Sequence, residues 1–169
     1  RNPALETLLE EVGVVEGRDA RGEPVFSEEA LCREPEERLF LKGLWYEGLY
    51  PRAGASTRDH DELRRFEAAM RAFAARRDAA GRRAFAIPRR LSAPDDETTG
   101  LDRLSMADWM AREGFGGARI RWFVEYGCRD DFGSSLSETS AWAGIHYFAA
   151  RLRGDSVTEE AAPFLTWPE

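Results

Sequence analysis

The spacing of apolar side chains predicts that helices dominate this chain. Between residues 63 and 73, apolar side chains recur every three or four positions and therefore share one face of a helix. Polar residues 56–61 can cap this long helix, and Gly81 is expected to end it. Apolar spacing and capping residues such as Asn2 and Ser105 predict further helices at residues 3–12, 106–113, 118–127 and 137–153.

Two shorter apolar segments predict strands. Residues 39–45 and 83–87 mix aliphatic and aromatic side chains and are followed by glycine or proline. We therefore expect a helix-rich α+β fold with a small mixed sheet built from these two segments, in a single domain over residues 1–169. Pro163 and Pro168 predict an irregular or extended C-terminal end. Polar segments predict loops at residues 16–24, 92–100 and 129–136.

The composition narrows the class of protein. With 43% hydrophobic and 33% charged residues, the 169-residue chain can form a globular core, and we expect a soluble, cytoplasmic protein. No apolar run approaches the ~20 residues of a membrane span, so no membrane partner is expected. The chain has no signal peptide and begins at Arg1 without a methionine, so we expect an excised or processed piece.

Positive charge gathers in one stretch of this acidic chain. Nine arginines lie between Arg64 and Arg90, against Glu67 and Asp78 as the acids. They could form a phosphate-binding or nucleic-acid-binding surface, or the solvated face of the long helix. The overall net charge of -7 favours the solvated face, so we expect no nucleic-acid partner.

Motifs for autonomous catalysis are missing from the sequence. Cys32 and Cys128 are too few for a disulfide framework, and with two scattered histidines they make no zinc pattern, so both are expected to be buried thiols. No G-x-G-x-x-G, P-loop or G-x-S-x-G occurs, and the run Gly114–Gly117 has the wrong spacing. Because hydride transfer needs a cofactor, this chain can do no redox chemistry unaided.

Polar chemistry concentrates between residues 122 and 148. Arg129, Asp130 and Asp131 follow an apolar segment directly. They could face a substrate, where carboxylates attract an amine and the arginine attracts an anion. Alternatively, they form a capping and ion-pair network at a helix end.

The last predicted helix places a second set of polar and aromatic groups on neighbouring faces. Gly144 lies in mid-helix, which costs about 1 kcal/mol relative to alanine and calls for close approach of a ring, a backbone or another helix. Trp142 and His146 are four residues apart and share a face, and Tyr147 follows directly. His146 could shuttle a proton or be a hydrogen-bonded core residue, and the latter is favoured.

Several strings in this sequence resemble a bacterial group of FAD-dependent oxidoreductases of the flavin amine oxidase type. The strings are Gly-Leu-Trp-Tyr-Glu-Gly-Leu-Tyr-Pro and its neighbours at residues 39–51, and the segments 84–88, 101–109 and 126–148. Residues 164–169 are similar to the segment that leads, in that group, into the returning flavin-binding part. The resemblance covers the middle, substrate-domain portion of such proteins.

The resemblance implies a fold, a cofactor and a reaction. It implies a substrate domain of mixed sheet and helices that covers a flavin held by the flavin-binding domain of the same polypeptide. FAD is then expected in the intact protein, and none bound to this chain alone. The reaction would be oxidation of a C–N or a C–C bond of a small molecule, with amines among the candidates, by hydride transfer to flavin. The competing interpretation is a non-catalytic binding or protein-interaction domain.

The resemblance and the density of polar aromatics give a set of candidate substrate-binding residues, although no catalytic base is identified. Trp109 is a further candidate for substrate packing, and nothing places Lys42, the single lysine, at a flavin. The candidates are Tyr126, Arg129, Asp131, Trp142, His146 and Tyr147.

Overall fold

The computed structural model describes residues 3–32, 37–152 and 164–165. The chain divides into two compact units, Arg1–Glu36 with Thr158–Glu169, and Glu37–Val157, and each is described by itself. The prediction of one domain over residues 1–169 stays a prediction. Asn2, Pro163 and Pro168, on which the predictions for the chain ends depend, lie outside the described residues.

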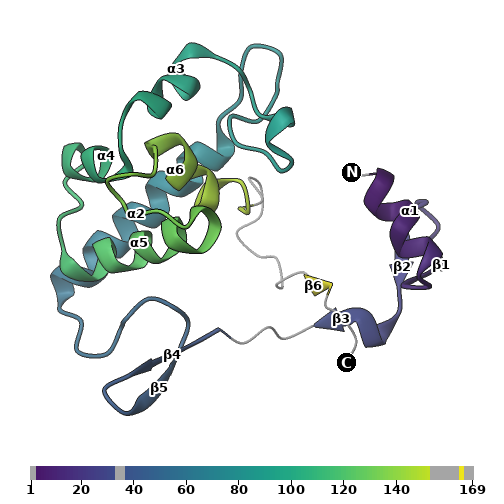
Figure 1. Cartoon of the computed structure of the whole chain (residues 1–169), viewed down its shortest axis with the longest axis horizontal. Coiled ribbons are helices and arrows are strands. Elements are labelled where there is room, and N and C mark those ends of the chain that lie inside the picture. Colours follow the sequence, from purple (N-terminus) through teal and green to yellow (C-terminus); the bar gives the residue numbers. More distant parts are fainter. Residues whose placement is uncertain (1–2, 33–36, 153–163, 166–169) are drawn as a thin grey trace. The chain divides into compact units, whose positions relative to one another are not determined.

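The described residues of the smaller unit form an α-helix, a hairpin, a short 3-10 helix and a short strand pair (Figure 1). Strands β1 and β2 are antiparallel, so the loop predicted over residues 16–24 is confirmed only for the turn at residues 19–23, and residues 16–18 and 24 belong to strands. Asp19 explains the hairpin, because its Oδ1 accepts hydrogen bonds from the backbone N–H groups of Arg21 and Glu23 at 2.8 and 2.9 Å. The elements of this unit are α1 (Pro3–Glu11), β1 (Val15–Arg18), β2 (Pro24–Phe26), η1 (Glu28–Ala30), β3 (Leu31–Cys32) and β6 (Phe164–Leu165), the last two paired antiparallel.

The larger unit begins with a second hairpin. Strands β4 (Arg38–Leu41) and β5 (Leu44–Glu47) pair antiparallel, with Phe40 opposite Trp45. Lys42 and Gly43 both have positive φ, 52° and 82°, as a tight hairpin turn requires. The prediction of one strand over residues 39–45 is therefore confirmed only in part, because these residues belong to two strands with a turn at Lys42 and Gly43 between them.

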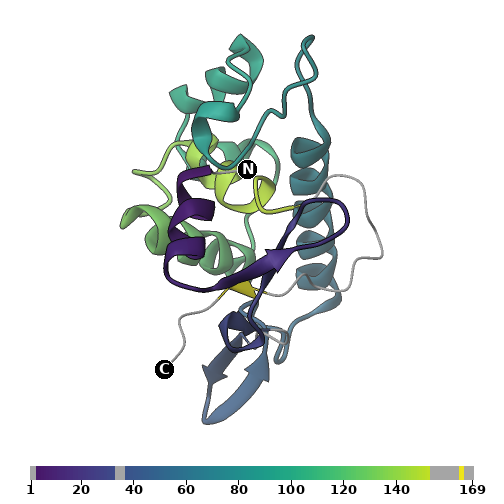
Figure 2. The ribbon, with the colours of Figure 1, turned by 90° about the vertical axis from the view of Figure 1, so that its right-hand side faces the viewer.

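Helices and their connecting segments make up the rest of the larger unit, and the long helix α2 packs against α5 and α6 (Figures 1 and 2). The elements are α2 (Thr57–Ala75), η2 (Arg89–Leu91), α3 (Asp96–Thr99), η3 (Gly100–Arg103), α4 (Met106–Arg112), α5 (Ala118–Phe132) and α6 (Ala141–Ala149). Together with the strands they confirm a helix-rich α+β fold. The small mixed sheet is wrong, because the described strands form three separate two-stranded antiparallel sheets.

The strand predicted at residues 83–87 is absent from the structure. The segment makes one isolated bridge, between Arg77 and Arg83, and most of its apolar side chains are buried, although Ile87 is exposed. Ala84 and Phe85 are fully buried there. A short apolar run satisfies a strand pattern and a buried coil equally well, and here burial decides.

Helix boundaries follow local capping groups. Ser56 and Asp59 form a reciprocal capping box at the start of α2, and the Ser105 hydroxyl caps α4, which confirms the helix predicted at 106–113. Helix α2 ends at Ala75, before Gly81, which instead lies in a turn closed by Asp78.

Three predicted boundaries near the candidate site are wrong. Helix α5 continues through residues 129–132 to a left-handed Gly133, so Arg129 and Asp131 lie on a helix and not in a loop. Helix α6 spans Ala141–Ala149, with Ser140 as its N-cap, and is shorter than the predicted 137–153. The predicted loop at 92–100 contains α3, which begins where Asp95 accepts a hydrogen bond from the Thr98 N–H at 2.9 Å.

A single apolar core joins these helices. Its side chains come from α2, α4, α5, α6 and the 84–86 segment. The largest fully buried side chains include Phe66, Met70, Phe85, Met106, Met110, Ile120, Val124 and Ile145. None of the helices in the described part of the chain is both long enough and apolar enough to cross a membrane.

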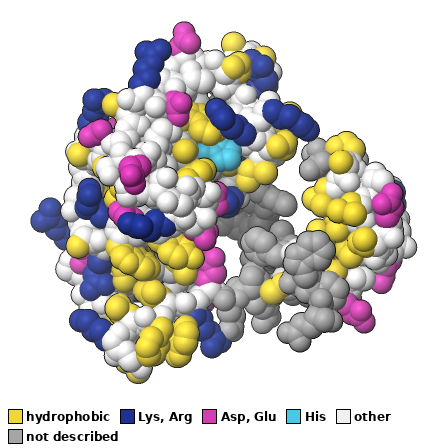
Figure 3. Space-filling view, in the orientation of Figure 1, with side chains coloured by type: hydrophobic (Ala, Val, Ile, Leu, Met, Phe, Trp, Pro, Cys, Tyr) yellow, Lys and Arg dark blue, Asp and Glu magenta, His cyan; other side chains and the backbone are white. Residues whose placement is uncertain are grey.

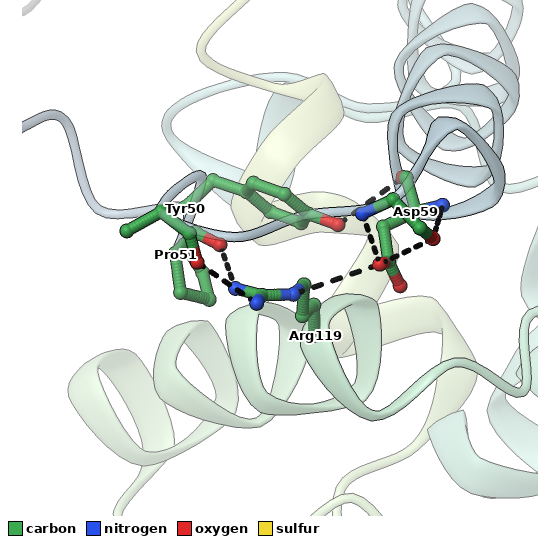
Figure 4. A network of polar contacts seen from close by, with 6 residues as sticks. Tyr50, Pro51, Asp59 and Arg119 are labelled. Atoms are coloured by element: carbon green, nitrogen blue, oxygen red, sulfur yellow. Dashed lines mark hydrogen bonds and ion pairs between the residues drawn. The ribbon is translucent and has the colours of Figure 1, made fainter.

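A polar network fastens the segment before α2 to α5 (Figure 4). The Arg119 guanidinium donates to the carbonyl oxygens of Pro51 and Ala53 and lies 3.6 Å from Asp59 Oδ2. The Tyr50 hydroxyl donates to the Asp59 carbonyl oxygen at 3.2 Å. One arginine thus satisfies carbonyl groups of a segment that has no regular structure of its own.

Candidate functional site

The six candidate residues do not form one site. On α6, Trp142 and His146 share a face, whereas Tyr147 is rotated from Trp142 by about 140° around the helix axis. Tyr147 instead lies beside α5, which carries Tyr126, Arg129 and Asp131. The structure therefore divides the candidates into a Trp142 face and an α5 face.

On the Trp142 face, the indole is held between other side chains. The His146 ring stacks on it with centroids 4.9 Å apart and planes 23° apart, and the buried Phe85 ring lies 5.6 Å away. The Arg89 guanidinium carbon lies 5.1 Å from the indole centroid, at cation–π distance. Arg89 comes from η2, so this face joins two segments far apart in the sequence.

A cleft of about 450 Å³ opens beside Trp142. Its volume is within the range of small-molecule sites, about 300–1,000 Å³. Its walls come from η2, the segment after it, α3, η3 and α6. The lining residues are Arg89, Arg90, Ser92, Ala93, Pro94, Thr99, Asp102 and Trp142.

The segment that carries Arg89 is tied at both ends. The Ser92 hydroxyl accepts a hydrogen bond from the Ala86 N–H at 2.9 Å, and the Ala93 N–H donates to the Arg83 carbonyl oxygen at 2.8 Å. His146 Nε2 lies 2.9 Å from the Ala86 carbonyl oxygen. Since a carbonyl only accepts, Nε2 must carry the proton, and His146 cannot use this nitrogen as a base. His146 is a positioning group for the cleft wall.

Three charged side chains of the cleft are available to a ligand. Within the described ranges, Arg89, Arg90 and Asp102 form no ion pair, although most of the other arginines between 64 and 90 pair with an acid or donate to a carbonyl. The Arg89 guanidinium is nevertheless fixed in orientation by the indole. The cleft thus combines oriented positive charge with an apolar wall.

The α5 face is more fully paired. Arg151 donates both to Asp131 Oδ1 and to Oδ2 at 3.0 Å, and its guanidinium carbon lies 4.4 Å from the Tyr147 ring centroid. Arg129 pairs with Glu125 at 2.7 Å, one helical turn earlier. The charges of Arg129 and Asp131 are therefore satisfied within the protein. This arrangement matches the ion-pair network that the sequence left open as an alternative.

Exposed aromatic rings complete the α5 face. Trp122 and Tyr126 stack with centroids 6.0 Å apart, and both are exposed. With Arg121, Glu125 and Arg129 they line a second hollow of about 300 Å³. Burial raises the pKa of the Tyr147 hydroxyl, and the nearby Asp130 carboxylate adds to this effect. Tyr147 is therefore a neutral phenol at neutral pH.

Two glycines explain how closely the helices around the site approach. A Cβ on Gly144 would lie 2.7 Å from Met106 Sδ, and one on Gly127 would lie 2.8 Å from the Tyr147 ring. Gly144 is therefore the small residue of a tight helix contact, with no room there for a ligand ring. Trp109, a further candidate for substrate packing, is buried against Phe66 and Phe115 in the core.

The glycine run before α5 is closed by the protein's own carboxylate. Gly117 is the N-cap of α5, and its N–H donates to Glu62 Oε1 at 3.0 Å. Glu62 is 6% exposed and comes from α2. A helix N-terminus can receive a phosphate, but here Glu62 occupies that position. No pyrophosphate-binding turn is therefore formed at residues 114–117.

The remaining candidate chemistry is structural. Cys128 is fully buried, as predicted, whereas Cys32 is half-buried, and burial raises the pKa of the Cys128 thiol. Over the residues that the structure describes, no three His, Cys, Asp or Glu side chains gather in a way that could hold a metal ion. Lys42 lies at the turn of the β4–β5 hairpin.

Comparisons with protein-family models, with curated proteins and with solved structures find no match to this chain.

Sequence reasoning missed the residues that give the cleft its charge. Arg89 and Arg90 end the arginine-rich stretch that was interpreted as a solvated face, and Asp102 lies in the family-like segment 101–109. The local sequence does contain one usable signal: two arginines directly after Pro88 have no acidic neighbour within a helical turn. Only the tertiary contact with Trp142 turns that signal into a site.

Proposed function

We propose that this chain is the substrate domain of an FAD-dependent oxidoreductase, in which a small-molecule substrate transfers hydride to flavin. The proposal combines the resemblance of residues 39–51, 84–88, 101–109 and 126–148 to the flavin amine oxidase group with a helix-rich α+β fold. The observation that carries it is the cleft beside Trp142. It is lined by Trp142, which belongs to one of the family-like segments, and it has the size of a small-molecule site.

In this proposal the chain contributes binding and orientation. Flavin accepts the hydride when bound, and the flavin-binding segments of the same polypeptide hold it. Trp142 gives the substrate an apolar wall, Arg89 gives it an oriented cation, and His146 keeps the Arg89 segment in place. Tyr126, Arg129, Asp131 and Tyr147, on the α5 face, do not line this cleft.

The test is the flavin content of the complete product of the encoding gene. We expect a G-x-G-x-x-G turn elsewhere in the same reading frame. We also expect stoichiometric FAD in the purified product, detected as visible flavin absorbance after gel filtration. The 169-residue chain, passed through the same column with added FAD, should lose it. A complete product that binds no FAD, or a 169-residue chain that keeps FAD in stoichiometric amount, refutes the proposal.

A non-catalytic interaction domain is the second candidate, and the β4–β5 hairpin favours it. Phe40, Leu44 and Trp45 are 57%, 61% and 66% exposed, and hydrophobic side chains cover much of the hairpin surface (Figure 3). Aromatic side chains are enriched at protein interfaces. This function would be preferred if the complete gene product carries no flavin and the hairpin variant Trp45→Ser alters its association state.

A further inference from the structure

The cleft beside Trp142 carries a more specific inference about its ligand. We propose that it binds a small monocarboxylate with a flat apolar body, and that the Arg89 guanidinium receives the carboxylate. As a statement about substrate class this rests on the proposed function. As a statement about binding it concerns only the residues of the larger unit.

Arg89 is oriented before any ligand arrives. Its guanidinium lies against the Trp142 indole, 5.1 Å from the ring centroid, and His146 stacks on the same indole. Contact with the indole favours this position of the guanidinium and leaves its N–H groups free to donate, since no described residue accepts a hydrogen bond from the Arg89 side chain. A planar fork of N–H donors matches the two oxygens of a carboxylate.

The backbone that carries Arg89 is also held in position. Ser92 bonds to the Ala86 N–H at 2.9 Å, and His146 donates to the Ala86 carbonyl oxygen at 2.9 Å. Ala86 precedes η2 and Ser92 follows it, so the Ala86–Ser92 hydrogen bond joins the two ends of this segment, and His146 holds the Ala86 end. A ligand therefore meets a wall that needs little ordering, and ordering is a major cost of binding.

Charge in the cleft favours a single negative charge on the ligand. Arg89 and Arg90 face one acid, Asp102, and none of the three forms an ion pair within the described ranges. The lining therefore has one net positive charge. A monocarboxylate neutralises it, whereas a phosphate monoester adds a second negative charge close to Asp102.

The rest of the lining favours a flat apolar body. Ala93, Pro94 and the Trp142 ring supply carbon surface beside the two arginines. Aromatic rings prefer offset or edge contacts with other rings and with proline. A benzoate-sized molecule would place its carboxylate at Arg89 and its ring against this surface.

The experiment is a titration of the ¹⁵N-labelled 169-residue chain with benzoate, followed by NMR chemical shifts. We expect saturable shifts of the Trp142 indole N–H and of backbone amides in residues 89–94 and 99–102. Phenyl phosphate and benzyl alcohol, which change the charge but keep the ring, should bind at least several-fold more weakly. Absence of saturation, shifts confined to other residues, or tighter binding of phenyl phosphate would overturn the proposal.

Variants separate the fork of Arg89 from its charge. Arg89→Lys keeps the charge and removes the planar fork, so benzoate affinity should fall about tenfold, which corresponds to about 1.4 kcal/mol. Arg90→Ala should weaken binding less. Arg58→Ala, at an exposed position at the start of α2 outside the cleft, should leave affinity unchanged. The proposal fails if Arg89→Lys binds benzoate as tightly as the parent, or if Arg58→Ala weakens binding as much. The ¹⁵N spectrum of each variant reports whether it is folded.

Failure of this inference and failure of the proposed function give different results. If the chain binds benzoate through Arg89 but the complete gene product contains no flavin, the carboxylate site stands and the oxidoreductase proposal is rejected. If the complete product contains FAD but benzoate does not bind, the carboxylate site is rejected and the oxidoreductase proposal stands.

Discussion

Replacement of Gly144 by alanine tests the tight contact between α6 and α4. Helix propensity alone favours Gly144→Ala by about 1 kcal/mol, because glycine loses more backbone entropy in a helix. The new Cβ, however, would lie 2.7 Å from Met106 Sδ and 2.8 Å from its Cγ, where carbon contacts normally need about 3.5–4.0 Å. Met106 is fully buried, so it cannot simply turn toward solvent.

The two effects can be weighed against each other. Overpacking a buried site costs about 1–3 kcal/mol, which exceeds the propensity gain over most of that range. We therefore expect Gly144→Ala to lower the free energy of unfolding by about 1 kcal/mol. Urea denaturation followed by tryptophan fluorescence measures it, with the slope of the unfolding free energy against urea unchanged.

Gly100 is the matched control. It has helical backbone angles, φ −59° and ψ −25°, and nothing lies within 4 Å of its added Cβ. Gly100→Ala should therefore stabilise the protein by about 0.4–1 kcal/mol. In a Met106→Ala background the obstruction is gone, and Gly144→Ala should become neutral or stabilising. If Gly144→Ala stabilises the parent as much as Gly100→Ala does, the packing at this helix contact has been misjudged.

Three further predictions concern single groups. Hydrogen bonds from Ser56 lower the pKa of the Asp59 carboxyl, so the contribution of this carboxylate to stability is complete above the ordinary aspartate pKa and is lost as pH falls through the lower, folded-state pKa. In Ser56→Ala, NMR titration should find the Asp59 pKa nearer its ordinary value. An unchanged Asp59 pKa would contradict this. In the native protein, iodoacetamide should modify half-buried Cys32 well before Cys128, because burial and a raised pKa disfavour the Cys128 thiolate. Mass spectrometry after a timed reaction measures the modification of each cysteine. Equal rates at the two cysteines would refute this prediction. Arg119→Lys removes the fork that holds two carbonyl groups, so amide hydrogen exchange in residues 52–55 should accelerate while exchange in the helices does not; unchanged protection of this segment would show that Arg119 is dispensable there.

Local sequence rules identified the helices that have their own capping groups. Ser56 with Asp59, and Ser105 with Asp108, both sit at helix starts where the sequence placed them. Asp95 and Ser140 carry the same kind of chemistry, but it was overlooked at Asp95 and placed inside a helix at Ser140. A capping side chain bonds to a backbone N–H within three residues of itself, so helix starts of this kind can be predicted from the local sequence.

Segments whose conformation depends on distant partners were misjudged. The 83–87 run has the composition of a strand, but Phe85 is buried among rings of α2 and α6 and finds no strand to pair with. Residues 129–131 look like a polar loop, yet α5 continues through them because Arg129 pairs with Glu125 and Asp131 with Arg151. Polar composition alone does not distinguish a loop from the exposed side of a helix.

The candidate site was predictable only in part. Spacing by four residues correctly joined Trp142 and His146 on one face of α6. Spacing could not show that Arg89 lies against the same indole, because α3, η3, α4 and α5 separate Arg89 from Trp142 in the sequence. Nor could spacing show that Tyr147 faces α5. The direction of the Tyr147 side chain depends on how α6, which begins after its N-cap Ser140, packs against α5.

We propose that the cleft beside Trp142 presents a substrate to flavin in the intact protein. The most direct measurement is the visible absorption spectrum of the FAD-containing complete gene product during titration with benzoate, because a ligand held against the flavin perturbs its absorption bands. We expect a saturable spectral change, with a benzoate affinity that falls about tenfold in Arg89→Lys and is unchanged in Arg58→Ala. A flavin spectrum that stays constant while benzoate saturates the cleft would contradict it.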